Sequence, residues 1–284
     1  MTSVQSKPGV NTAVFGKLQW PLIHGTAYIL QHMPQDPSRR DCEAFAKMLA
    51  ATKKTMPCRF CRASFARFVD AELKATRCRS PAEWVRHRMC FDVTVSLHDR
   101  VSEKLDAQWF EGAADLRSRR VPDASIAKVY RALPSYIHPR DVFDLLMLYC
   151  MNAQTLCASG KRVLRVEDCD TADMCAALAD LVACMPWALR LQERHDRIGG
   201  SLRTREGEEC LRAARVIEAS AQDFSEACRT RGGMGMFDAC FSMFLEYTTG
   251  GKDIPLDAAV AARDATLRRL GAAASNVCKA ETCA

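Results

Sequence analysis

The chain has 284 residues, 48% hydrophobic and 26% charged, which is an ordinary globular composition and long enough for two hydrophobic cores. Its net charge of +6 comes from interspersed basic and acidic residues, not from a basic arm or face, so nucleic acid is not an expected partner. The sequence contains neither an apolar stretch of roughly 18 residues nor an apolar leader. No membrane span and no secretory signal are therefore expected.

Ala, Leu, Arg, Glu and Met dominate the composition, and these good helix formers predict an all-α fold. Four segments of the first half have helical spacing of apolar residues and are separated by short breaks: 15–32, 39–54, 58–73 and 83–105, the last perhaps in two pieces. They predict a compact four-helix bundle. The expected domains are 1–115, a second helical domain at 116–270 after a charged linker at 112–125, and a flexible tail at 271–284.

Eleven of the 15 cysteines fall into two kinds by their neighbours. Seven stand among Leu, Ala, Met and Phe and are expected to be small buried hydrophobic residues: Cys150, Cys157, Cys175, Cys184, Cys210, Cys228 and Cys240. Two pairs are closely spaced, Cys58 with Cys61 and Cys278 with Cys283. These pairs are the candidates for thiol chemistry.

The first pair is a C-x-x-C sequence that directly follows Pro57. Proline suits the first turn of a helix, so Cys58 and Cys61 are predicted at a helix N-terminus, where unpaired N–H groups favour a thiolate. Arg59 and Arg62 add positive charge there. The pattern favours reversible dithiol redox chemistry. The alternative is a zinc-stabilised helical interaction module with Cys58 and Cys61 as ligands, although no second C-x-x-C or H-x-x-x-H stands at finger spacing.

Two helical stripes flank this pair in the sequence and mix aromatic, histidine and hydroxyl side chains with aliphatic ones. The first stripe, on 15–32, consists of Lys17, Trp20, His24 and Tyr28. The second, on 83–105, consists of His98, Val101, Ser102 and Leu105. Such faces can stack on a planar heteroaromatic ring, or they can be amphipathic helix faces with hydrogen-bonded histidines. With the cysteine helix between them, a flavin site is the favoured interpretation.

Residues 15–110 resemble the Erv/ALR family of FAD-linked sulfhydryl oxidases. Three family motifs occur in the same order: G-[RK]-x-x-W-x-x-x-H at Gly16, Lys17, Trp20 and His24; P-C-x-x-C with a later Phe at Pro57, Cys58, Cys61 and Phe65; and H-N-x-V-N-x-x-L at 98–105. Asp99 and Ser102 stand where the family has asparagines.

The resemblance implies a four-helix FAD-binding bundle that often dimerises, so a homodimer is expected. Substrate protein dithiols would attack Cys58, Cys61 would be released against the flavin, and O2 would take the electrons to give H2O2. No metal is expected. Stripes and motifs together give the expected FAD-binding residues: Gly16, Lys17, Trp20, His24, Tyr28, His98, Asp99, Val101, Ser102, Lys104 and Leu105.

Residues 116–270 carry no motif, although residues 173–190 echo the segment 129 positions earlier, with Trp187 and Arg190 at the two cysteine positions. The second domain is either a degenerate, redox-inactive copy of the first or an unrelated helical domain. Longer family members from large DNA viruses also carry an added helical domain. They imply the cytoplasmic side, a viral factory or a virion, rather than the mitochondrial intermembrane space. The tail pair is either an electron relay on a mobile arm or two incidental thiols.

Overall fold

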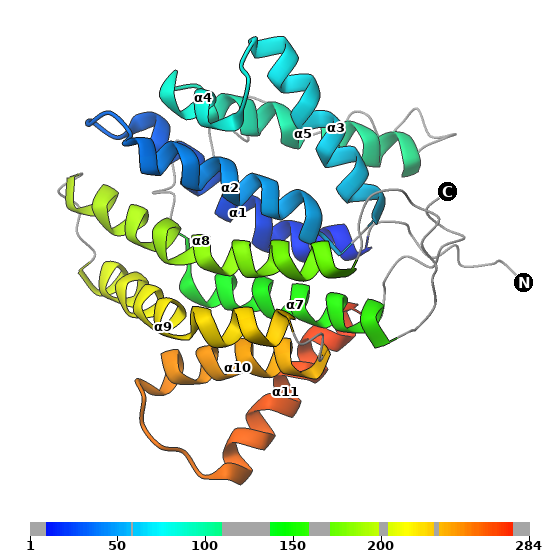
Figure 1. Cartoon of the computed structure of the whole chain (residues 1–284), viewed down its shortest axis with the longest axis vertical. Helices are drawn as coiled ribbons and strands as arrows, with labels where there is room; N and C mark the ends of the chain where they lie inside the picture. Colours follow the sequence, from blue (N-terminus) through cyan, green and yellow to red (C-terminus); the bar gives the residue numbers. More distant parts are fainter. Residues whose placement is uncertain are drawn as a thin grey trace, which may run out of the picture.

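The computed structural model describes residues 10–57, 59–109, 137–158, 171–198, 204–229 and 233–274 (Figure 1). Within these residues every regular element is a helix, which confirms the predicted all-α class. The helices are α1 (Val10–His32), α2 (Arg39–Thr55), α3 (Arg59–Thr76), α4 (Pro81–Arg86), α5 (Cys90–Trp109), α7 (Pro139–Ala158), α8 (Thr171–Ile198), α9 (Thr204–Arg229), α10 (Gly233–Thr249) and α11 (Leu256–Ala274).

The predicted breaks of the first half lie where local chemistry ends one helix and begins another. Ser38 caps α2 in a reciprocal capping box, because its side chain accepts a hydrogen bond from the backbone N–H of Asp41 and its backbone N–H donates to the Asp41 carboxylate. Pro81 begins α4 at a position where a missing N–H costs nothing. The predicted helix 83–105 is in two pieces, α4 and α5, separated near Arg88, whose φ of 56° lies in the left-handed region.

Arg88 also fixes the loop that follows α1. Its guanidinium donates to the backbone carbonyl oxygens of Met33 at 2.6 Å and Gln35 at 2.7 Å, and it pairs with the Asp36 carboxylate at 2.9 Å. A cation at a helix C-terminus is favourable because the last carbonyl groups there lack partners within the helix. The turn between α4 and α5 therefore holds the end of α1 in place.

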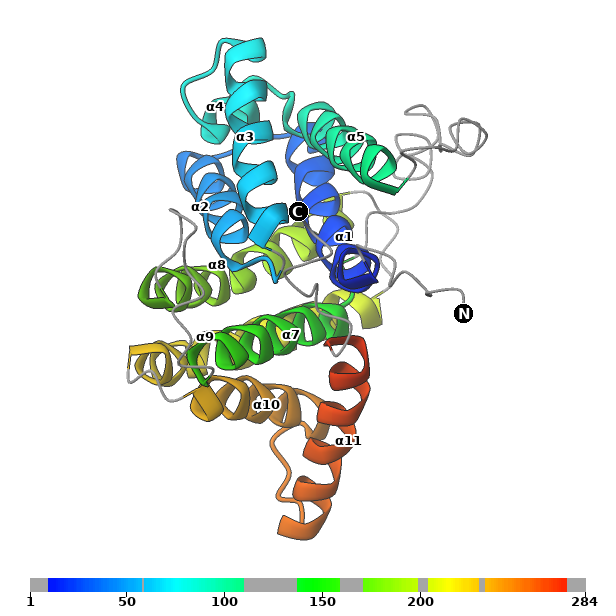
Figure 2. The same ribbon diagram turned by 90° about the vertical axis from the view of Figure 1, so that its right-hand side faces the viewer.

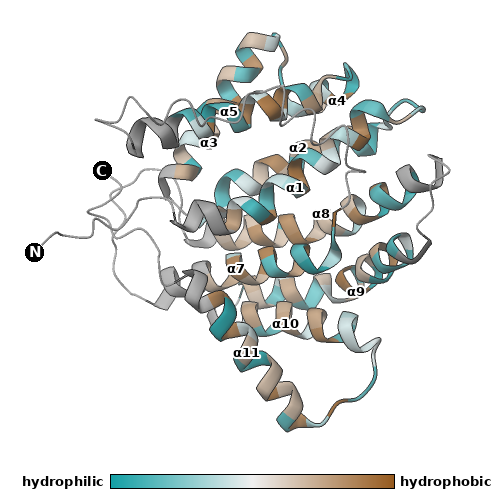
Figure 3. Cartoon of the chain, turned by 180° about the vertical axis from the view of Figure 1, so that it is seen from behind, coloured by the Kyte–Doolittle hydropathy of each residue, from teal (hydrophilic) through white to brown (hydrophobic). Residues whose placement is uncertain are grey.

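The helices lie in successive layers along the long axis of the molecule (Figures 1 and 2). Helices α1, α2, α3 and α5 pack against one another in a ring, with α4 against α2. Helix α2 packs extensively on α8, α8 on α9, and α10 on both α7 and α9. Figure 3 shows hydrophobic residues along much of α7 and α8, the helices in the middle of the stack.

The two expected domains share one hydrophobic core. Phe45 and Trp84, from the first half, belong to the same cluster of buried side chains as Phe143 and Phe237 from the second half. The expected boundary near residue 115 lies outside the described residues and stays a prediction. Whatever connects the two halves, their helices are buried against each other and not separated by solvent.

Helix α8 meets the length and composition of a membrane span over Asp173–Arg194, although the sequence analysis expected no span. Two-thirds of that window is buried inside the fold, which is the environment of a core helix, so this resemblance to a span is weak.

Helix α8 also contains the segment that echoes the cysteine motif in the sequence. Pro186 lies inside the continuous α8, whereas the matching Pro57 follows the end of α2. The two echoing segments therefore differ in local structure.

Asp41 joins the two halves. Its carboxylate is buried and accepts a hydrogen bond from the Trp187 Nε1 of α8 at 2.9 Å, while Arg194 lies 3.3 Å away. Burial alone would raise the pKa of this carboxyl, but the hydrogen bonds from Trp187 and Ser38 and the charge of Arg194 lower the pKa on balance. The fold therefore holds Asp41 as an anion at the start of α2.

We expect Asp41→Ala to lower the free energy of unfolding by about 2–4 kcal/mol, because it removes the carboxylate half of the α2 capping box and leaves the Trp187 N–H without its acceptor. Urea unfolding measures this loss. Glu43→Ala, which removes an exposed pair with Arg39, is the matched control and should change stability by less than about 0.5 kcal/mol. Equal effects of the two substitutions would contradict the role assigned to Asp41.

Candidate functional site

The predicted stripe of α1 places two rings in the interior. Trp20 and His24 are buried, Tyr28 is partly buried, and Lys17 is exposed. Gly16 is buried one turn before Trp20, where an added methyl group would meet the indole at 3.7 Å, an ordinary contact. The stripe therefore runs from a solvent-exposed amine to an enclosed imidazole.

The second predicted stripe, on α5, meets the first through His98. The His98 ring stacks on Trp20 with ring centres 4.1 Å apart and planes 11° apart, and His24 stacks on the same indole at 5.1 Å and 19°. Asp99, Val101 and Ser102 are half-buried further along α5. The side chains of Lys104 and Leu105 lie outside the described residues. Three flat rings from two helices thus form one stack.

The cysteine motif contributes to the same place through α3. Phe65 packs edge-on against Trp20, with ring centres 6.2 Å apart. Cys61 lies one helical turn before Phe65 and is half-buried against the core. Cys58 lies outside the described residues. Because Phe65 belongs to the cysteine motif, all three predicted motifs bring a side chain to the Trp20 stack.

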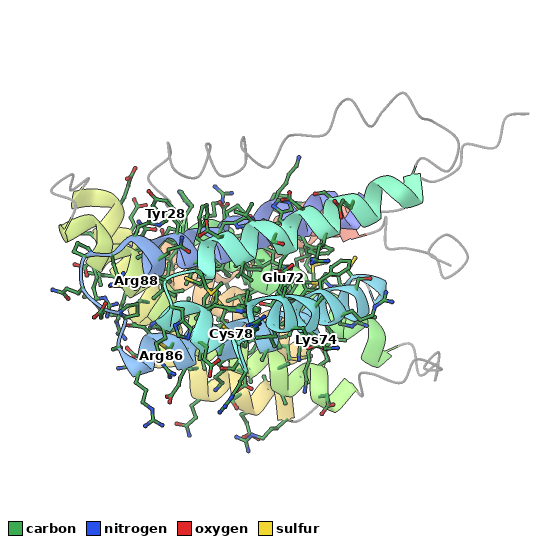
Figure 4. All side chains as sticks on the ribbon, turned by 90° about the horizontal axis from the view of Figure 1, so that it is seen from above. Tyr28, Glu72, Lys74, Cys78, Arg86 and Arg88 are labelled. Atoms are coloured by element: carbon green, nitrogen blue, oxygen red, sulfur yellow. The ribbon has the colours of Figure 1, made fainter. Side chains whose placement is uncertain are left out.

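Two side chains fix the start of α3 and its position against α5. Arg62 donates hydrogen bonds to the carbonyl oxygens of Met56 and Pro57, which holds the turn that leads into the cysteine motif. Glu72 is buried between α3 and α5 (Figure 4), where it accepts from Ser96 Oγ at 2.8 Å and from Arg100 Nε at 2.6 Å. From the sequence, Arg62 was expected only as a positive charge, and no motif indicated Glu72.

A short relay of hydrogen bonds sets the proton positions on both histidines. Thr94 Oγ1 donates to the Phe91 carbonyl at 2.8 Å, so it must accept from His24 Nδ1 at 3.1 Å. His24 Nε2 then carries a lone pair and accepts from His98 Nδ1 at 2.9 Å. In this arrangement both rings are neutral, and His98 Nε2 is an acceptor.

The pKa values agree with neutral rings. Burial lowers the pKa of His24 well below its ordinary value, and the nearby His98 lowers it further. Burial also lowers the pKa of His98 to about 4. Removing an imidazolium from water is unfavourable without a paired anion, so the fold keeps the stack uncharged at neutral pH.

Helix α7 brings one residue to the site that no motif indicated. Tyr149 is buried and its hydroxyl donates a hydrogen bond to Gln19 Oε1, next to Trp20 on α1. Burial raises the pKa of Tyr149, and a negative charge on Cys61 would raise it further. No local pattern in the sequence relates Tyr149 to residues more than 80 positions earlier, which is why sequence reasoning missed it.

The described residues include no candidate metal site. Among them, no three His, Cys, Asp or Glu side chains are grouped in a way that could hold an ion. Cys58, and the tail cysteines Cys278 and Cys283, lie outside the described residues.

Comparison with known proteins adds no family: no family model matches the sequence, and neither a curated protein nor a solved structure matches it.

We expect the stability of the fold to fall as the pH is lowered from about 6.5 to about 4. The folded state keeps His98 neutral down to a pKa of about 4, whereas an unfolded histidine takes up its proton near pH 6.5. The unfolded chain therefore binds more protons in this window, and protons favour unfolding. The shift corresponds to about 3 kcal/mol for His98.

Urea unfolding at a series of pH values measures this loss in the wild type and in His98→Gln, which lacks the titrating ring. The variant should lose less stability on acidification than the wild type, by an amount on the order of 3 kcal/mol. His87→Gln, at an exposed position after α4, is the control and should follow the wild type. Parallel curves for wild type and His98→Gln would show that His98 is not held neutral.

Proposed function

We propose that the protein is an FAD-dependent thiol oxidase that forms disulfides in protein substrates. The observation that carries this proposal is the meeting of Trp20, Phe65 and His98 at one place. These residues come from three helices and from three separate motifs, each of which the sequence relates to FAD or to thiol chemistry. Ordinary core packing does not require that all three motifs converge.

The residues of the stack suit a flavin in their charge and their aromatic character. Trp20, His24 and His98 offer flat faces, and both imidazoles are neutral, so an uncharged heteroaromatic ring meets no buried cation. His98 Nε2 is an acceptor, and Ser102 offers a hydroxyl on the same half-buried side of α5. Lys17, exposed at the start of the stripe, could pair with phosphate oxygens.

The chain's own chemistry in this proposal is thiol–disulfide exchange. A substrate thiolate attacks Cys58 of the oxidised pair, a mixed disulfide forms, and Cys61 leaves as a thiolate. A second substrate thiolate then attacks the substrate sulfur of the mixed disulfide, which releases Cys58 and the substrate disulfide. FAD, when bound, would accept the two electrons of the reduced pair and pass them to O2, giving H2O2.

Cys61 is well situated for the inner role. It is half-buried and lies one turn before Phe65, which packs against Trp20. The proposal keeps three expectations from the family resemblance: protein dithiols as substrates, a homodimer, and a place on the cytoplasmic side, in a viral factory or in a virion.

We expect Cys61→Ser and Cys58→Ser each to reduce dithiothreitol oxidation by roughly a hundredfold or more, because exchange needs both sulfur atoms. Oxygen consumption measures the rate, and the flavin spectrum checks that cofactor stays bound. Cys78→Ser, which changes a half-buried thiol after α3, is the control and should keep the wild-type rate. Wild-type oxygen consumption by either motif variant would exclude the proposed chemistry.

Trp20→Ala should weaken FAD binding by about tenfold or more, because the largest stacking surface of the site is lost. Flavin retained after gel filtration provides the measurement. Trp84→Phe alters a buried tryptophan outside the stack and should retain the cofactor. A colourless wild-type protein with one zinc per chain would instead support the zinc-stabilised module, and full flavin retention by Trp20→Ala would mean that the stack is ordinary core.

A further inference from the structure

The turn between α3 and α4 concentrates much of the positive charge of the chain. Residues 74–88 include five basic residues and one acidic residue, a net charge of +4, whereas the whole chain carries +6. Four of the basic side chains are exposed: Lys74 in the last turn of α3, Arg77 and Arg79 between the helices, and Arg86 at the end of α4. We call these four residues the basic turn. Figure 4 shows Lys74 and Arg86 on the face of the molecule that α3 and α4 form.

The basic turn is not neutralised from within the fold. None of its four side chains forms a salt bridge or a side-chain hydrogen bond with another residue that the structure describes. Glu83, the acid of this segment, instead accepts a hydrogen bond from the backbone N–H of Arg79 at 2.7 Å. Basic side chains on other helices do have acidic partners: Arg39 pairs with Glu43, Arg190 with Glu218 and Arg263 with Asp238.

Arg77 has a backbone conformation that arginine rarely adopts. Its φ of 57° lies in the left-handed region, where glycine and asparagine are under less strain. Arg88 is the other non-glycine residue with a positive φ in the described part of the chain, and its guanidinium binds the end of α1. The exposed Arg77 guanidinium makes no such contact with a described residue. Contacts within the fold therefore do not explain why this position carries arginine.

Hydrogen bonds hold the backbone of the basic turn in place. The Trp84 indole of α4 donates to Thr76 Oγ1 at 2.9 Å, which joins α4 to the end of α3. The backbone N–H of Cys78 donates to the Leu73 carbonyl at 3.0 Å, and α4 itself packs on α2. A binding partner would therefore meet side chains on a backbone that is already ordered, which lowers the entropy lost on binding.

We propose that the basic turn binds a short acidic segment of a partner protein, rich in Asp and Glu. Three of its four side chains are arginines, whose guanidinium groups pair with carboxylates through two parallel hydrogen bonds. The proposed oxidase chemistry involves Cys61 at the start of α3, whereas the basic turn lies at the end of that helix. Binding needs neither FAD nor the cysteine pair, so it goes beyond the proposed function and can be tested apart from it.

The surroundings of the basic turn favour a short partner over nucleic acid. Exposed acidic side chains border it: Asp70 on α3, Asp36 beside Arg88, and Asp92 at the start of α5. A long polyanion that extended beyond the turn would meet these carboxylates. Single-stranded nucleic acid also stacks its bases on exposed aromatic rings, but Trp84, the aromatic residue of α4, is fully buried.

The basic turn also lacks the apolar side chains that anchor a protein in a lipid surface. Among the residues that the structure describes, the large hydrophobic side chains that are exposed are Leu256 and Val260. Both lie on α11, at the opposite end of the stack from α4 (Figure 1). Contact at the basic turn is therefore made through charge and hydrogen bonds.

The test measures fluorescence anisotropy of a labelled peptide of twelve alternating Glu and Asp residues with the full chain. We expect binding that weakens as salt is raised, because exposed charges are screened. Arg77→Asn removes the guanidinium but suits the left-handed backbone, so it should weaken binding by about threefold without lowering the melting temperature. Arg77→Asn combined with Arg79→Gln and Arg86→Gln should weaken binding by about tenfold or more.

A matched control removes the same net charge from the other end of the molecule. Arg215→Gln, Lys252→Gln and Arg268→Gln change three exposed basic residues of α9, the loop after α10, and α11. This combined variant should keep the wild-type affinity for the acidic peptide. Circular dichroism melting curves check that each variant is folded.

Three results would overturn the proposal, and none depends on flavin. The first is the absence of measurable binding to the acidic peptide at low salt. The second is an equal loss of affinity in the two combined variants, which would assign binding to net charge alone. The third is tighter binding of duplex DNA, or of vesicles that contain phosphatidylserine, than of the peptide. Arg79→Gln and Arg86→Gln, measured singly, provide the same test if the combined variant does not fold, because neither position is strained.

Discussion

Helix α8 must bury two of its sides, because α2 packs on it from the first half and α9 packs on it from the second. That constraint explains its composition, which is apolar enough over Asp173–Arg194 to match a membrane span. It also explains the polar contacts at its margins. Trp187 and Arg194 reach Asp41 at the start of α2, so the direction of the helix against its neighbour is set by hydrogen bonds and not by apolar contact alone. With α8 in place, α7 can approach α1, and Tyr149 meets Gln19.

The candidate site combines two kinds of control that act on the same rings. Packing from α3 and α5 sets where Trp20 and His98 lie, with Glu72 joining the two helices beside them. The relay from Thr94 through His24 sets which nitrogen atoms carry protons. The Thr94 hydroxyl therefore determines that His98 Nε2, at the far end of the stack, is a hydrogen-bond acceptor. Because burial disfavours charge on either imidazole, the arrangement does not switch near neutral pH.

The parts of this structure that the sequence predicted are those encoded by neighbours along the chain. The short breaks and the helical spacing of Trp20 and His24 placed the first helices and identified two of the rings that meet. What could not be predicted depends on contacts between distant segments. Tyr149 lies on a helix with no motif, and its apolar neighbours look the same for an ordinary core residue as for a functional one. The echo around Pro186 stayed open in the sequence for a related reason, since a proline inside a long helix and one between two helices have similar local sequences.

The guanidinium of Arg88 has a consequence for which substitutions the fold can accept. It reaches four carbonyl groups, those of Met33 and Gln35 at the shortest distances, and one carboxylate through N–H groups held in a rigid plane. A lysine carries the same charge on a single compact ammonium, which cannot span the Met33 and Gln35 oxygens in the same way. Arg88→Lys, usually regarded as a conservative substitution, would release the segment between α1 and α2. The loss of these contacts would also weaken the capping of α2 by Ser38, which follows this segment. At this turn the shape of the donor group limits variation more than its charge does.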